Sequence, residues 1–154
     1  MATVKLMSSP IMLCTDGSDA ALRALCAGVD LLGRDHDFVL VTVMDAPEEA
    51  SMVGSGHAGP DLTLEEYHDQ LAQARETAES AIAKARGELA LQGAEVHLLG
   101  GDAGAAICQL ATDVSARAIV VGSRGRGRLK RAFLGSVSDH VVRNAPCSVI
   151  VTRI

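Results

Sequence analysis

The hydrophobic positions of the chain follow two patterns, short continuous runs and longer stretches with helical spacing. The five short runs are rich in Val, Ile and Leu, and turn-forming residues lie between the elements. Continuous apolar runs of this length are typical of strands that are buried on both faces. The predicted strands span residues 11–15, 38–43, 95–99, 118–121 and 148–152.

Four stretches between these runs have the spacing of amphipathic helices, with an apolar residue every three or four positions. Each begins at a residue suited to an N-terminal cap or ends at one that stops a helix. The expected helices run from Ser18 to Gly33, from the capping box Thr63-x-x-Glu66 to near Gly93, from Asp102 to Val114, and from Ser136 to Asn144.

The alternation of strands and helices predicts one α/β domain over residues 11–154, after a lead-in of residues 1–10. Short turns and helical crossovers imply a doubly wound, Rossmann-like parallel sheet of five strands in the order 3-2-1-4-5, with helices on both faces. In such sheets ligands bind at the carboxyl ends of the strands, where the strand order reverses. Asp16 and Gly122 follow the first and fourth strands and should face each other there. Residues 44–60 lack periodicity and are expected to form a surface loop, a candidate lid.

Composition narrows the classes of function. Aromatic residues make up only 2% of the chain, which argues against nucleic-acid binding by base stacking. The net charge of −5 is unevenly distributed: residues 1–121 hold 7 basic and 18 acidic side chains, whereas residues 122–154 hold 7 and 1. A basic segment on an acidic body suits a small polyanion better than a DNA backbone. A merely solvated basic surface is the alternative.

The four cysteines form no C-x-x-C pair, and each lies in an apolar run. We interpret them as small buried hydrophobic residues in a reducing compartment. The sequence shows no stretch of transmembrane length and no signal-peptide pattern. We therefore expect a cytoplasmic protein that binds no membrane. The five histidines lack metal-ligand spacing.

A glycine-rich segment follows the fourth predicted strand and carries five basic residues: Arg124, Arg126, Arg128, Lys130 and Arg131. Glycines, a helix N-terminus and positive charge together are what phosphate binding requires. No Gly-Lys pair exists, so a Walker A loop is excluded, and the dinucleotide fingerprint fails in spacing and position. The spacing present is Gly122-x2-Gly125-x9-Gly135-Ser136.

In this spacing the chain resembles the ATP-binding subgroup of the universal stress protein family, whose signature is G-x2-G-x9-G-[ST]. The segments Cys14–Ser18, Val41–Asp45 and Asn144–Val149 are also similar to that family, so the resemblance covers residues 10–154. It implies that the main chain of Val43 binds adenine and that Asp16 holds ribose or a nucleotide-bound Mg²⁺ or Mn²⁺.

The resemblance further implies that main-chain N–H groups from Gly122 to Gly127 and from Gly135 to Val137 surround the phosphates. Ser136 would add a hydroxyl group, and Cys14 and Val121 would line the base pocket. The nucleotide-binding residues expected in this way are Cys14, Thr15, Asp16, Val43, Val121, Gly122, Ser123, Arg124, Gly125, Arg126, Gly127, Gly135, Ser136, Val137 and Ser138.

The leading hypothesis is a binding protein, an ATP-dependent switch or sensor in a stress response that forms a homodimer through the edge strand 148–152. The spacing of the Ser, His, Asp and Cys residues indicates no catalytic arrangement. We therefore expect that the protein is not an enzyme. The alternatives are slow ATP hydrolysis, autophosphorylation at Ser136 or Ser138, and a partner-binding module that takes no nucleotide. In the alternative without a nucleotide site, Gly122, Gly125 and Gly135 serve only turns, and Asp16 is only a turn residue or a cap.

Overall fold

The computed structural model describes residues 9–47, 62–123 and 134–153. Five parallel strands form one sheet in the order β3-β2-β1-β4-β5, as predicted. The strands are β1 (Ile11–Cys14), β2 (Phe38–Val43), β3 (Glu95–Leu99), β4 (Ala118–Gly122) and β5 (Ser148–Thr152). The helices between them are α1 (Asp19–Leu32), α2 (Leu64–Leu89), α3 (Ala103–Asp113) and α4 (Ser136–Asn144).

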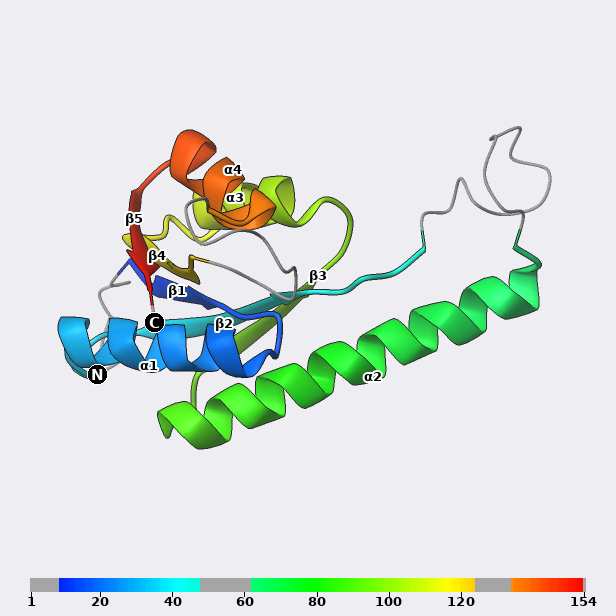
Figure 1. Cartoon of the computed structure of the whole chain (residues 1–154), viewed down its shortest axis with the longest axis horizontal. Helices are drawn as coiled ribbons and strands as arrows, with labels where there is room; N and C mark the ends of the chain where they lie inside the picture. Colours follow the sequence, from blue (N-terminus) through cyan, green and yellow to red (C-terminus); the bar gives the residue numbers. More distant parts are fainter. Residues whose placement is uncertain (1–8, 48–61, 124–133, 154) are drawn as a thin grey trace, which may run out of the picture.

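Two layers of helices enclose the sheet (Figure 1). One face packs against α1 and α2 and the other against α3 and α4, and each face has its own apolar cluster. Successive residues of β1 point to opposite clusters: Leu13 joins the first, while Met12 and Cys14 join the second. All four residues of β1 are buried, which explains why its sequence is continuously apolar rather than alternating.

The predicted caps are present at three helix starts. Ser18 accepts a hydrogen bond from the N–H of Ala21, Asp102 accepts one from Ala105, and Thr63 and Glu66 form the reciprocal capping box. Helix α2 ends at Leu89, earlier than the expected stop near Gly93, because Ala90 adopts the left-handed conformation with φ of 54°. Arg34 stabilises this end by donating to the carbonyl of Leu89 at 2.7 Å.

Helix α2 extends well past the strands that it covers (Figure 1). Its 26 residues make it about 39 Å long. All its buried residues lie between Ala78 and Leu89, whereas Leu64 is 57% exposed. The predicted apolar stripe is therefore used for the core only in the carboxyl-terminal half of the helix.

The structure describes only part of one predicted feature, and it corrects another. Of the predicted loop 44–60, residues 48–60 lie outside the described residues. Among the four cysteines only Cys14 is buried, while Cys26, Cys108 and Cys147 are half-buried at the margins of the two clusters. Within the described ranges, no helix combines the length and apolarity needed to cross a bilayer.

Candidate functional site

Strand β1 is shorter than its neighbours at the carboxyl edge of the sheet. Its register ends with Cys14 beside Val41 on one side and Leu13 beside Val120 on the other. Strand β2 continues to Val43 and β4 to Gly122. The centre of the sheet therefore has a gap at this edge, at the point where the strand order reverses.

A tight turn takes the chain out of this gap. The hydroxyl of Thr15 accepts a hydrogen bond from the N–H of Gly17 at 3.0 Å, and the carboxylate of Asp16 accepts one from Ser18 at 2.9 Å. Gly17 has a φ of 79°, which favours glycine. The turn leads directly into the N-terminus of α1 and leaves Asp16 beside the gap.

The hydrogen-bond register shows that the main chain of β2 faces the gap at Val43. In a strand, the N–H and C=O groups of successive residues point alternately to the two neighbouring strands. The carbonyl of Val41 accepts from Thr15 on the β1 side, and the N–H of Met44 donates to Leu99 on the β3 side. Val43 has the same parity as Val41, so its N–H and C=O are directed toward the line of β1 beyond its end.

The same alternation applies to β4. The N–H of Ser123 donates to the carbonyl of Thr152 in β5 at 2.8 Å. Gly122, one residue earlier, therefore directs its N–H and C=O to the other side, toward the line of β1. The early end of β1 thus leaves main-chain groups of two strands facing one space.

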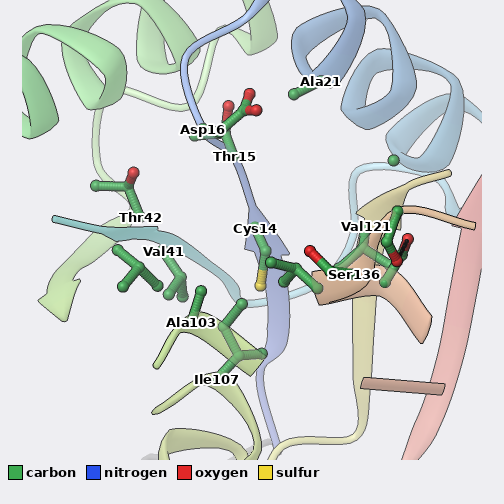
Figure 2. A pocket seen from close by; sticks show the side chains of 15 residues that line it. Cys14, Thr15, Asp16, Ala21, Val41, Thr42, Ala103, Ile107, Val121 and Ser136 are labelled. Atoms are coloured by element: carbon green, nitrogen blue, oxygen red, sulfur yellow. Dashed lines mark hydrogen bonds between the residues drawn. The ribbon is translucent and has the colours of Figure 1, made fainter. Parts of the chain in front are cut away.

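A cavity of about 200 Å³ lies at this place. Figure 2 shows Cys14 on β1 between side chains from β2 and α3 on one side and from β4 and α4 on the other. This volume is below the roughly 300–1,000 Å³ of pockets that enclose a whole drug-sized ligand, so it suits one ring system of a larger ligand. The lining residues are Cys14, Thr15, Asp16, Ala21, Val41, Thr42, Val43, Ala103, Ile107, Val121, Gly122, Gly135, Ser136, Val137 and Ser138.

Helix α4 begins at the cavity without a side-chain cap. Its N-cap is Gly135, whereas α1 and α3 are capped by Ser18 and Asp102. The N–H of Gly135 is already engaged, because it donates to the carbonyl of Ser123 at 2.9 Å. Among the described residues, the first-turn N–H groups of Ser136 and Val137 donate to no main-chain acceptor, and they lie at the positive end of the helix dipole, where an anion can bind.

Ten of the fifteen predicted site residues line the cavity: Cys14, Thr15, Asp16, Val43, Val121, Gly122, Gly135, Ser136, Val137 and Ser138. Ser123 does not line the cavity, and its N–H donates to the carbonyl of Thr152. Arg124, Gly125, Arg126 and Gly127 lie outside the described residues. Among the described residues, the main-chain N–H groups that we still expect to donate hydrogen bonds to phosphate are those of Gly122, Ser136 and Val137.

Five lining residues were not expected from the sequence: Ala21, Val41, Thr42, Ala103 and Ile107. The signal for Ala103 was available, because it directly follows the capping Asp102 after the third strand. It therefore had to lie at the carboxyl edge of the sheet.

The electrostatics of the cavity are simple. Among the described lining residues, the ionisable side chains are Asp16 and Cys14. Burial raises the pKa of the Cys14 thiol far above its ordinary value, and the nearby thiols of Cys108 and Cys147 raise it further. The cavity floor is therefore uncharged at neutral pH. A carboxylate beside such a floor fits a sugar hydroxyl or a cation held by phosphates.

The fold and this site define a class: doubly wound α/β proteins with a ligand cavity at the switch point of the sheet. The family model of the universal stress protein family matches residues 7–153, and the chain belongs to that family. A universal stress protein of Thermus aquaticus, encoded in the 3′ region of a QAH/OAS sulfhydrylase, is 34% identical over 148 residues. The alignment covers 96% of this chain and 100% of the relative.

Solved structures share this fold. The universal stress protein UspA from Lactobacillus plantarum superposes with a TM-score of 0.74 at 24% identity, covering 94% of this chain and 97% of that one. The universal stress protein from Archaeoglobus fulgidus in complex with dAMP has a TM-score of 0.57 at 26% identity. Coverage there is 96% of this chain and 99% of the other.

Proposed function

We propose that this chain is a cytoplasmic protein that binds an adenine nucleotide at the end of β1 and acts as a nucleotide-dependent switch in a stress response. The observation that carries the proposal is the early end of β1, which directs main-chain groups of Val43 and Gly122 into one apolar cavity. The dAMP complex of the Archaeoglobus fulgidus relative supports the ligand class.

Each part of the nucleotide has a suitable partner in this proposal. The cavity accepts the base, because its floor is apolar and the N–H and C=O of Val43 suit the donor and acceptor on the adenine edge. Asp16 holds the ribose, or Mg²⁺ or Mn²⁺ carried by the phosphates. The first turn of α4 binds phosphate through Ser136 and Val137. ATP is the ligand that we propose for the full site.

We propose binding without efficient turnover. Asp16 is the one carboxylate among the described lining residues, and the thiol of Cys14 stays protonated because burial raises its pKa. Hydrolysis needs a group that orients or activates water next to the γ-phosphate. Phosphate release from ATP should therefore stay near the uncatalysed background, and sustained release that disappears in Asp16→Ala would reverse this proposal.

A homodimer through β5 is the second part of the proposal. The other sheet edge, β3, carries Glu95 and His97, which pair at 2.8 Å. A charged side chain on an edge strand, such as that of Glu95, discourages pairing with another chain. Strand β5 reads Ser-Val-Ile-Val-Thr and contains no acidic or basic residue. An isologous pair of β5 strands would cover this apolar edge.

A filled cavity tests the proposed site. Ala103 lines the cavity from α3, and Ala105 lies two residues further on the exposed side of the same helix. Ala103→Phe should fill the base pocket and weaken adenine nucleotide binding by at least about tenfold, roughly 1.4 kcal/mol. Ala105→Phe is the matched control and should leave affinity unchanged.

Isothermal titration of nucleotide-free protein with ATP, ADP and AMP, with and without Mg²⁺, is the measurement. Wild-type protein that binds none of them below about 1 mM, or roughly −4 kcal/mol, would refute the proposed function. Equal affinities of the Ala103→Phe and Ala105→Phe variants would place the site elsewhere.

A further inference from the structure

Ser138 is one of the few buried polar residues among the described part of the chain, with 5% of its surface exposed. It is the third residue of α4 and also borders the cavity. Its hydroxyl lies 3.0 Å from the carbonyl oxygen of Gly135 and 3.3 Å from that of Ser123. A hydroxyl has one proton to donate, and here both acceptors within reach are main-chain carbonyls.

These contacts join two points that are separated in sequence by residues 124–134. The carbonyl of Ser123 receives the N–H of Gly135 at 2.9 Å as well as the hydroxyl of Ser138. Ser123 in turn donates its own N–H to Thr152 of β5. The first turn of α4 is therefore tied through Ser138 and Ser123 to the carboxyl ends of β4 and β5.

The arrangement separates the roles of two neighbouring serines. Ser136 is exposed at the start of α4, whereas Ser138 is buried and engaged with the main chain. We propose that Ser138 is a positioning residue: its hydroxyl fixes the first turn of α4 so that the N–H groups of Ser136 and Val137 meet the phosphates. This inference rests on the proposed nucleotide site and assigns Ser138 a role other than direct contact.

Loss of the Ser138 hydroxyl should affect binding of the phosphates and leave binding of the base unchanged. The first turn of α4 borders the cavity on the proposed phosphate side, whereas the proposed partners of the base come from β1, β2 and α3. The hydroxyl of Ser138 bonds to the carbonyls of Ser123 and Gly135 and to no group of those three elements. Loss of this hydroxyl should therefore weaken binding of ADP but not of adenosine. A general loss of structure would weaken the binding of ADP and of adenosine alike.

The test compares Ser138→Ala with Ser138→Thr, which keeps the hydroxyl, and with Val141→Ala. Val141 is fully buried on the same helix and lies outside the cavity lining, so its truncation lowers stability without touching the hydroxyl contacts. We expect the Kd of Ser138→Ala for ADP to rise about threefold to tenfold, the range for one lost hydrogen bond. Adenosine affinity should stay unchanged, and Ser138→Thr and Val141→Ala should bind ADP like the wild type.

If Ser138→Ala does not fold, Ser138→Cys replaces it, because a thiol is a weak donor of similar shape. Its ADP affinity should fall between those of the wild type and the alanine prediction. ADP binding by Ser138→Ala at wild-type strength, or an equal loss of adenosine and ADP affinity, would overturn the positioning role. Wild-type protein that binds neither ligand would instead overturn the proposed function.

Discussion

The imidazole ring of His140 in α4 lies directly against Gly104 in α3. A Cβ placed on Gly104 would be 2.5 Å from Cγ of His140 and 2.7 Å from its Cβ. Rotation of the His140 side chain could move its Cγ, but its Cβ moves only with the main chain of α4, so the contact at 2.7 Å would persist. The absence of a side chain at Gly104 therefore sets how closely the two helices approach next to the cavity.

Gly104→Ala should destabilise the protein even though alanine is the better helix former. Overpacking at such a contact costs about 1–3 kcal/mol, which exceeds the roughly 0.5–1 kcal/mol that the Gly-to-Ala change contributes in a helix. Urea denaturation gives the free energy of unfolding. Gly87→Ala in α2 is the matched control, because a Cβ there meets nothing within 4 Å, and it should stabilise. A stabilising Gly104→Ala would contradict the contact.

The thiol of Cys14 should make stability fall at alkaline pH. Its pKa is raised in the folded protein by burial, so the folded state keeps a proton that the unfolded state releases above about pH 8.5. The unfolded state then binds fewer protons, and the free energy of unfolding decreases as pH rises, by at most about 1.4 kcal/mol per pH unit for one group. Denaturation of the wild type and Cys14→Val at pH 7 to 10 checks this. The variant should show the smaller slope, and equal slopes would exclude the contribution of Cys14.

Val149→Pro should separate the proposed dimer without unfolding the protein. The carbonyl of Thr152 faces β4, so by strand alternation the N–H of Ile150 also faces β4 and that of Val149 faces outward. Among main-chain donors, proline at position 149 removes only this outward N–H, and the alanine control accounts for the loss of the partly buried Val149 side chain. Sedimentation should show a folded monomer, with Val149→Ala remaining dimeric as control. A dimer of unchanged strength in Val149→Pro would exclude pairing through β5.

The two halves of α2 should differ in local stability. Buried residues of α2 occur only from Ala78 onward, and the N-terminal part of the helix extends past the strands. Amide hydrogen exchange depends on local opening, which is easiest where few apolar contacts hold the backbone. Amides of residues 67–74 should exchange faster than those of 81–89. Equal protection along the helix would show that its first half is covered in solution, and repetition at several protein concentrations would reveal cover by a second copy.

Much of the fold could be predicted because local and global signals agree. The continuous apolar runs coincide with buried strands, and caps such as Ser18, Thr63 and Asp102 act within three residues of their partners. The sequence predicts the end of α2 too far along the chain, because no glycine stands directly after Leu89. Ala90 takes the left-handed conformation there, with the carbonyl of Leu89 held by Arg34 from 55 residues away.

Ten of the residues that line the cavity could be predicted from the sequence, but their hydrogen bonds could not. Spacing and resemblance indicate Ser138, yet its partners depend on how Ser123 and Gly135 meet after the chain folds. The same limit applies to the N–H groups of Ser123 and Gly135, which the protein uses internally. A one-dimensional motif names the residues of a loop, whereas tertiary contacts decide which donors remain for a ligand.

The early end of β1 also bears on how this site tolerates mutation. Val43 and Gly122 face the cavity through main-chain groups, which every L-amino acid other than proline supplies in the same form. Point mutations along β2 and β4 can then alter side chains while the hydrogen-bonding groups at the edge of the gap persist. Such a site can survive extensive sequence drift as long as the strand lengths are kept, so an insertion or deletion in β1 should be more damaging than most substitutions.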